Sequence, residues 1–348
     1  MFVVALAVLA ALAPHKIPGY FTLVDWSTIA TLLGLMILTK GIERSGWLHR
    51  IGRIIVAHIA NERMLALFLV FGSALAAMLL TNDIALFVVV PLTLGLGELA
   101  VLPLRRLIIF EALAVNAGSM LTPIGNPQNI FLWQQSGVSF IAFMAHMLAP
   151  FLIANLCLLL LTSAAFSSRR IAVNPTPDDA VIHKPLLAAS ALLYLPFLVL
   201  ADLHHPAFAL ALVAAVFLFA FPKLLRRIDW SLLAVFVLMF IDLGLLGQYP
   251  IFANLNLAHP GTLYVTGAVV SQAISNVPAA ILLATHSADW GTIAWAVNVG
   301  ALGLVIASLA NLIALRLGRQ PGSYIAFHVW SLPFFLVVGT LVWLWLRL

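Results

Sequence analysis

Four short polar segments interrupt long apolar runs, and their side chains could bind a small ion or solute. They read TND at 81–83, GNPQN at 125–129, SNV at 275–277 and ASLAN at 307–311. Amides and hydroxyls dominate them, and both groups donate and accept hydrogen bonds. The chemistry these segments offer is therefore recognition of a solute or a dehydrated cation.

Catalytic signatures are missing from the sequence. It contains no nucleophile–base pair that we could identify, no H-E-x-x-H segment and no phosphate-cradling glycine loop, so we expect neither an enzyme nor a resident cofactor. Its one cysteine, Cys157, excludes a disulfide framework and a cysteine-rich metal centre. Only a transient Na⁺ or H⁺ fits this composition.

Composition indicates a protein surrounded by lipid. Hydrophobic residues make up 64% of the 348 residues and charged residues only 8%, with a mean hydropathy of +1.12. A soluble domain carries about 25% charged residues. The net charge of +5 is better explained by basic cytoplasmic loops than by nucleic acid, so we expect a lipid bilayer and no nucleic-acid partner.

Apolar runs predict an all-α polytopic protein, because about 20 apolar residues are needed to span a bilayer. No basic region precedes residues 1–13, so we expect a first span there and not a cleaved signal peptide. About nine spans are predicted, at 2–13, 24–43, 107–137, 140–165, 185–201, 207–221, 229–247, 291–315 and 325–346. Polar residues break the spans 107–137 and 291–315.

Basic residues set the expected orientation. Placing the lysine and arginine clusters in the cytoplasm puts the N-terminus there too. Segment 64–101 must then enter and leave from the cytoplasmic side, and segment 261–288 from the opposite side. These are two opposed re-entrant hairpins. We expect residues 47–62 to form an amphipathic helix on the cytoplasmic surface, with an ordinary loop as the alternative.

An internal repeat organises the chain into residues 1–165 and 185–348, joined by a cytoplasmic linker at 166–184. VDWS at 24–27 matches IDWS at 228–231, and residues 116–130 align without a gap to residues 298–312. The predicted orientations of the matched segments are opposite. Such inverted repeats are typical of secondary transporters, in which discontinuous helices form the binding site.

The polar breaks must be held by the protein itself, because lipid cannot satisfy backbone N–H and C=O groups. Pro127 removes a backbone donor, and Gly125 allows unusual dihedral angles. We expect half-helices here, whose N-termini favour anions and whose C-terminal carbonyls favour cations. The alternative is that the amides of the breaks only pair the broken backbone.

Three carboxylates fall within apolar segments. Asp83 lies at the first hairpin tip, where a charge costs about 2.5–3.5 kcal/mol at the bilayer centre. It could carry a proton, bind a cation or cap the returning helix. Glu111 and Asp242 are further proton-coupling candidates; Glu111 could instead pair with Arg105, and Asp242 with Lys40. Asp25 and Asp229 precede Trp at span starts and are expected to be helix caps.

Three segments carry a family resemblance: TNDIALFVVVPLTL, EALAVNAGSMLTPIGNPQNIF and SNVPAAILL. They resemble the ion transporter superfamily, which includes the arsenite efflux pump, NhaD-type sodium/proton antiporters, citrate–metal symporters and divalent anion/sodium symporters. Over nearly the whole chain the sequence also resembles bacterial inner-membrane proteins of the YbiR type, which implies anion transport. The resemblance implies a scaffold domain, a mobile transport domain with elevator-type motion, and a homodimer.

In the dicarboxylate members of the superfamily, two Ser-Asn-Thr tips and two helix breaks bind substrate and Na⁺ together. The matching residues here are Thr81, Asn82, Asp83, Gly125, Asn126, Ser275, Asn276, Val277, Ala307 and Ser308, and Asn129 adds an amide. Asn82, Asp83 and Gly125 are the candidate Na⁺ ligands. Asp83 and Val277 replace the family threonines, and the Asn-Asp tip is more similar to the arsenite pump, which implies proton coupling.

We therefore expect a secondary active transporter that moves a small anion across a bacterial inner membrane, coupled to H⁺ or Na⁺. Arsenite or other metalloid efflux and Na⁺/H⁺ antiport are the alternatives among transporters. A passive ion channel is the alternative of another class, and saturable counterflow would distinguish the two.

Overall fold

The structure, a computed structural model, describes residues 14–47, 61–171, 182–247 and 257–347, together with residues 6, 50 and 59. Most of the expected span 2–13, of the expected surface helix 47–62 and of the linker 166–184 lies outside these residues. Within the described part the fold is all-helical, and its only β-pairing is an isolated bridge between Asn61 and Arg170.

The helices follow the predicted segments to within a few residues. In the first half they are η1 (Pro14–Gly19), α2 (Tyr20–Leu23), α3 (Trp26–Arg44), α5 (Glu62–Leu79), α6 (Asn82–Leu99), α7 (Leu104–Ser119), α8 (Pro127–Ser136) and α9 (Phe140–Ala165). In the second half they are α10 (Lys184–Asp202), α11 (Pro206–Ala220), α12 (Pro222–Leu225), α13 (Trp230–Leu246), α14 (Pro260–Ile274), α15 (Asn276–Ala284), α16 (Trp290–Gly300), η3 (Val305–Ala307), α17 (Leu309–Gly318) and α18 (Ser323–Trp345).

Membrane-crossing capacity agrees with a multi-pass protein. In the described part of the chain, α5, α9, α10 and α18 are each long and apolar enough to cross a membrane. A fifth span results if Ile17–Leu23 and Trp26–Arg44, bent by 57°, count as one. The predicted total of about nine spans also counts shorter helices, and it counts each pair of half-helices as one span. That total stays a prediction.

The starts of α3 and α13 confirm the capping role of the two Asp-Trp pairs. Asp25 Oδ1 accepts a hydrogen bond of 3.0 Å from the backbone N–H of Thr28. Asp229 Oδ1 accepts the equivalent bond, also 3.0 Å, from Leu232. Each carboxylate satisfies one of the free N–H groups at a helix start.

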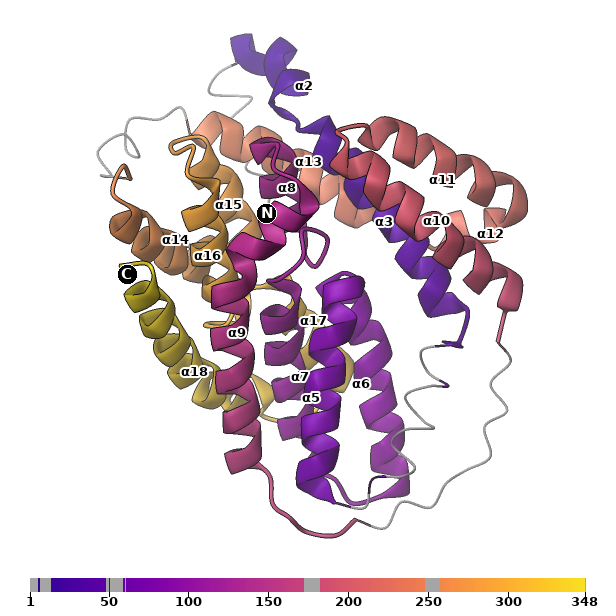
Figure 1. Ribbon diagram of the computed structural model, residues 1–348, viewed down its shortest axis with the longest axis vertical. Helices are drawn as coiled ribbons and strands as arrows, with labels where there is room; N and C mark the ends of the chain where they lie inside the picture. Colours follow the sequence, from indigo (N-terminus) through magenta and orange to yellow (C-terminus); the bar gives the residue numbers. More distant parts are fainter. Residues whose placement is uncertain are drawn as a thin grey trace.

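Two groups of helices can be distinguished in Figure 1. Helix α3 packs against α10 and α11, and α12 and α13 also contact it. The second group holds the hairpin α5–α6, the pair α14–α15 and the broken helices α7–α8 and α16–α17, with α9 and α18 along its side. Contacts of α3 with α6 and α8, and of α13 with α15, join the groups.

Both predicted broken helices are interrupted. The chain between α7 and α8 is non-helical over residues 120–126, and the chain between α16 and α17 contains only the 3-10 turn η3. The two hairpin turns are shorter. Ser275, between α14 and α15, has φ +76°, a conformation that residues other than glycine rarely adopt.

Small residues let each hairpin approach the broken helix beside it. A Cβ added to Gly118 of α7 would lie 2.2 Å from the carbonyl oxygen of Ala74 in α5. In the second half, a Cβ on Gly300 of α16 would lie 2.6 Å from Cβ of Ser271 in α14. Close backbone approach of this kind is typical of helix pairs in membranes.

We predict that Gly118→Ala destabilises the protein by about 1–3 kcal/mol, because the methyl group meets rigid backbone. Thermal unfolding of the purified protein in detergent measures the effect. Gly72→Ala is the matched control, since nothing among the described residues lies within 4 Å of the added methyl. Equal melting temperatures for the two variants would show that α5 and α7 are not packed this closely.

Candidate functional site

Asparagine amides hold the two helix breaks. Asn129 is fully buried, and its Nδ2 donates to the carbonyl oxygens of Ser119 (3.2 Å), Met120 (3.2 Å) and Thr122 (3.1 Å). The last carbonyls of a helix have no partner within the helix, and lipid offers none. Asn129 thus satisfies the end of α7 from within α8.

The second break repeats this arrangement. Asn311 of α17 donates from Nδ2 to the carbonyl oxygens of Ala301 (3.0 Å) and Leu304 (3.4 Å). Residues 301, 304 and 311 each lie 182 positions after residues 119, 122 and 129, which is the offset of the aligned segments. The two breaks therefore use the same donor on equivalent acceptors.

Two further asparagines join the breaks to each other. Asn116 Nδ2 of α7 donates to Asn311 Oδ1 at 2.8 Å, and Asn298 Nδ2 of α16 donates to Asn129 Oδ1 at 2.7 Å. Each donor also bonds the carbonyl four residues before it in its own helix. Each half of the chain thus supplies the donor for one bond and the acceptor for the other.

The residues that start the returning half-helices complete the network. Asn126 Nδ2 donates to Asn298 Oδ1 at 2.9 Å, and Ser308 Oγ donates to Asn116 Oδ1 at 2.9 Å. Asn126 and Ser308 are again 182 positions apart. We call the six residues Asn116, Asn126, Asn129, Asn298, Ser308 and Asn311 the amide core; each is at most 2% exposed.

The hairpin tips contact the two breaks at equivalent places. The backbone N–H of Asn82 donates to the carbonyl oxygen of Gly125 at 2.8 Å. Ser275 Oγ donates to the carbonyl oxygen of Ala307 at 3.3 Å. The structure therefore brings these four predicted site residues together in two pairs, one pair in each half.

Within each tip the asparagine side chain accepts a hydrogen bond from the backbone N–H of the next residue. Asn82 Oδ1 accepts from the N–H of Asp83 (3.0 Å), and Asn276 Oδ1 accepts from the N–H of Val277 (2.9 Å). Both asparagines are buried. Asn82 Oδ1 keeps a second lone pair, whereas Asn276 Oδ1 also accepts a hydrogen bond of 3.3 Å from Ser275 Oγ.

A cavity of about 520 Å³ lies between the two helix groups and reaches the first hairpin tip. Of the predicted site residues, Thr81 and Asp83 line it, and the second tip does not. Helices α6, α8, α13 and α17 all begin at or beside the cavity. Its lining is Leu32, Met36, Lys40, Thr81, Asp83, Ile84, Phe87, Pro127, Arg227, Ile228, Asp229, Leu232, Leu309 and Ile313.

Asp83 is the carboxylate that the first tip presents to this cavity. It is the second residue of α6, and no described residue donates a hydrogen bond to its side chain, so the capping alternative receives no support from the contacts. Asp229 lines the same cavity. The Asp83 carboxylate therefore faces the cavity without a hydrogen bond to any described side chain or backbone group.

Glu111 and Asp242 do not form the ion pairs considered above. Glu111 is fully buried and accepts a short hydrogen bond from the Thr93 hydroxyl, while Arg105 donates to the carbonyl of Pro321. The alternative of a Glu111–Arg105 pair was wrong, because Glu111 on α7 contacts Thr93 of α6. Neither Glu111 nor Asp242 lines the cavity.

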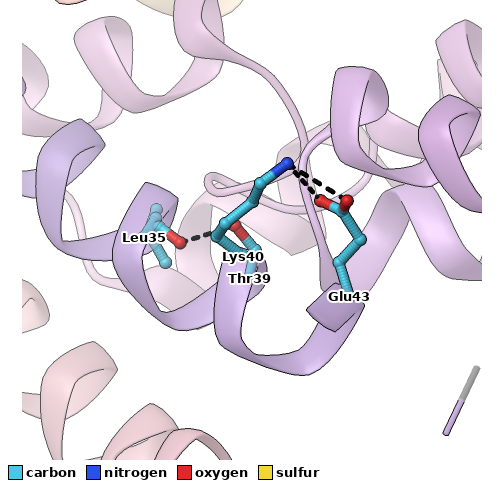
Figure 2. A network of polar contacts seen from close by, with 4 residues as sticks. All are labelled: Leu35, Thr39, Lys40 and Glu43. Atoms are coloured by element: carbon cyan, nitrogen blue, oxygen red, sulfur yellow. Dashed lines mark hydrogen bonds and ion pairs between the residues drawn. The ribbon is translucent and has the colours of Figure 1, made fainter. Parts of the chain in front are cut away.

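Asp242 is 1% exposed in α13, and neither carboxylate oxygen has a hydrogen-bond partner among the described residues. The alternative of a pair with Lys40 was wrong. Lys40 Nζ instead contacts both carboxylate oxygens of Glu43, at 2.8 and 3.1 Å (Figure 2). A partner one turn away on the same helix displaced the more distant one.

Sequence reasoning missed several residues of this site. Asn116, Asn298 and Asn311 were visible in the aligned repeat, but only the residues at the breaks were selected. Lys40 and Arg227 were read as orientation markers, because nothing in the linear sequence places them on one cavity. No group of three or more His, Cys, Asp or Glu side chains suited to a metal occurs within the described ranges.

Paired helix breaks, each held by buried amides next to a cavity, are typical of membrane transport proteins. A sequence profile described as that of citrate transporters matches residues 1–307. The chain therefore belongs to the citrate transporter family, and it is a membrane transporter and not an enzyme.

Relatives agree with this assignment. The chain is 46% identical over 343 residues to the inner membrane protein YbiR of Escherichia coli, covering 96% of this chain and 90% of the relative. It is 32% identical to an uncharacterized transporter of Methanocaldococcus jannaschii, covering 86% and 83%. It is also 30% identical to a silicon efflux transporter of Oryza sativa, but only over 37% of this chain and 27% of that protein.

We predict that Asn129 and Asn298 are energetically coupled. In a double-mutant cycle of Asn129→Ala and Asn298→Ala, the unfolding free energies in detergent should deviate from additivity by about 0.5–3 kcal/mol. The control cycle pairs Asn129→Ala with Asn155→Ala, since Asn155 bonds Ala117 and Phe151 and shares no partner with Asn129. Additivity in both cycles would contradict the bond between the breaks.

Proposed function

We propose that this protein is a secondary active transporter that moves a small anion across a bacterial inner membrane, coupled to H⁺ or Na⁺. The observation that carries the proposal is the amide core with its adjoining cavity. Two helix breaks with equivalent bonds meet there, and Asp83 opens on the cavity beside them. Membership of the citrate transporter family supports an anion as cargo.

Helix starts support the choice of an anion. The half-helices α8 and α17 both begin at the cavity, and α17 has no side-chain cap on its first N–H groups. A helix N-terminus is equivalent to roughly half a positive charge. The hairpin tips at 81–83 and 275–277 contain no arginine. The amides and helix starts can therefore stabilise the negative charge of the cargo in its place.

Asp83 is our candidate for the coupling residue. Its carboxylate faces the cavity without a hydrogen-bond donor among the described residues, at a tip whose Asn82 also offers an amide oxygen. Carboxylate, amide and carbonyl oxygens suit a hard cation, so Asn82, Asp83 and Gly125 could hold Na⁺. A proton on Asp83 is the other option, with Glu111 and Asp242 as weaker candidates.

The matched bonds at an offset of 182 residues support an inverted repeat, with units 1–165 and 185–348. In this proposal the N-terminus is cytoplasmic and the hairpins α5–α6 and α14–α15 are re-entrant. The second group of helices moves against a scaffold of α3 and α10–α13 in an elevator motion. We propose a homodimer, as the family resemblance implies.

Metalloid efflux is the second candidate function. The Asn-Asp tip of the first hairpin and the identity to a silicon efflux transporter favour it. Under this alternative the cargo is a neutral oxyacid, and the amide core binds its hydroxyl groups.

Reconstituted protein tested by solid-supported-membrane electrophysiology can separate these functions. Jumps in Na⁺, pH, citrate, succinate, sulfate and arsenite should identify the cargo and the coupling ion. Saturable counterflow of labelled citrate would support a carrier, and its absence together with sustained conductance would indicate a channel. Silicic acid transport without any anion response would favour the second candidate.

We predict that Asp83→Asn removes the dependence of the anion-evoked current on the coupling ion, because the amide can hold neither a proton nor a cation by charge. Asp25→Asn is the control, since Asn caps a helix as well as Asp does. Currents in Asp83→Asn that still follow the same gradient would assign the coupling to another residue.

A further inference from the structure

The cavity has a cationic wall that the amide core does not explain. Lys40 lies near the end of α3, and Arg227 lies just before α13. Both line the cavity, opposite Thr81 and Asp83 of the hairpin. They come from the helix group of α3, α12 and α13, so they face the first tip from outside the group that contains it.

Lys40 is held in place by one local ion pair and one ring. Its Nζ contacts both Glu43 oxygens, as Figure 2 shows, and lies 5.6 Å from the centroid of the Phe87 ring. Phe87 is one turn after Asp83 on α6, so the two share a face. The ammonium therefore lies against the face of α6 that also carries Asp83.

The Lys40–Glu43 pair has little reason to exist as a structural bond. Its side chains are only 17% and 13% exposed, so both charges lose much of their hydration. The pair joins one turn of a single helix and connects no two elements. Pairs at this spacing add little to the stability of an isolated helix. Two largely buried charges at this place are better explained if Lys40 exchanges Glu43 for another anion.

Two carboxylates, Asp83 and Asp229, share the cavity lining with Lys40 and Arg227. Asp229 uses its Oδ1 to cap α13, and Glu43 does not line the cavity. Arg227 makes no side-chain hydrogen bond or ion pair with any described residue. Lys40, which is paired only with Glu43, and Arg227, which has no such partner among the described residues, thus line the same cavity.

We propose that Lys40 and Arg227 form an anion subsite on the scaffold wall of the cavity, and that Glu43 occupies Lys40 until a carboxylate or oxyanion displaces it. This inference rests on the proposed anion transport and names the charged contacts of that cargo. The subsite would receive the anion before it reaches the amide core. Glu43 then acts as an internal competitor.

Binding measurements on single and double variants test the proposal. We would titrate citrate and sulfate into the full-length protein in nanodiscs by calorimetry, and measure citrate counterflow in proteoliposomes. Lys40→Gln and Arg227→Gln should each raise the Kd about tenfold, the effect of losing one charge-assisted bond. Glu43→Gln should lower the Kd by about threefold, because it removes the competing carboxylate.

Matched variants separate a subsite from a general field effect. Arg226→Gln removes the same charge one residue away, outside the cavity lining, and should leave the Kd unchanged. Lys40→Gln/Glu43→Gln should bind as weakly as Lys40→Gln alone, because Glu43 acts only through Lys40. Equal Kd values for the Arg226 and Arg227 variants, or weaker binding in Glu43→Gln, would overturn the subsite.

Measurements on the wild-type protein distinguish failure of the subsite from failure of the proposed anion transport. If wild type binds and transports citrate or sulfate but Lys40→Gln has an unchanged Kd, the subsite is wrong and anion transport stands. A variant with altered ion coupling and an unchanged Kd would likewise overturn the subsite and make Lys40 a counter-ion of Asp83. If wild type transports silicic acid and binds neither anion, the proposed function fails, and the subsite fails with it.

Discussion

Backbone groups left open by a broken helix must find partners inside the protein, and this constraint explains most of what surrounds the site. At each break one asparagine side chain donates to carbonyls at the end of the preceding half-helix. The same asparagine accepts from an asparagine of the other half. Because the bonds that repair one break also tie it to the other, the two breaks are held as one unit.

A core held in this way can move only as a whole, which fits a transporter better than a site assembled from independent loops. Its boundary with α3 and α10–α13 is where the cavity lies. The helix group of the amide core contributes helix starts and Asp83 to the cavity, whereas the opposite wall contributes Lys40, Arg227 and Asp229. An anion at the boundary would therefore contact both groups of helices, and its charge would be shared between them.

Much of the helical fold could be predicted from the sequence, because apolar length and polar interruptions are local signals. The span predicted at 140–165 coincides with α9, and polar residues marked both helix breaks and both hairpin tips. The aligned segments 116–130 and 298–312 predicted a repeat, and the structure adds the equivalent bonds that the two segments make. Contacts between distant elements were not predictable in the same way. Lys40 pairs with Glu43 and not with Asp242, and Glu111 bonds to Thr93 and not to Arg105. The rotation of each helix about its axis determines which side chains meet.

Pulsed electron-electron double resonance would test most directly whether the core moves as one unit against the scaffold. Spin labels at Leu192 of α10 and Phe71 of α5, both exposed, report the distance between the two groups, after replacement of Cys157. Labels at Leu192 and Phe208 report a distance within the scaffold. The account predicts two populations for the first pair, with a ratio that changes on addition of citrate, and one unchanged distance for the second. A single unchanged distance for both pairs, in labelled protein that still transports, would contradict it.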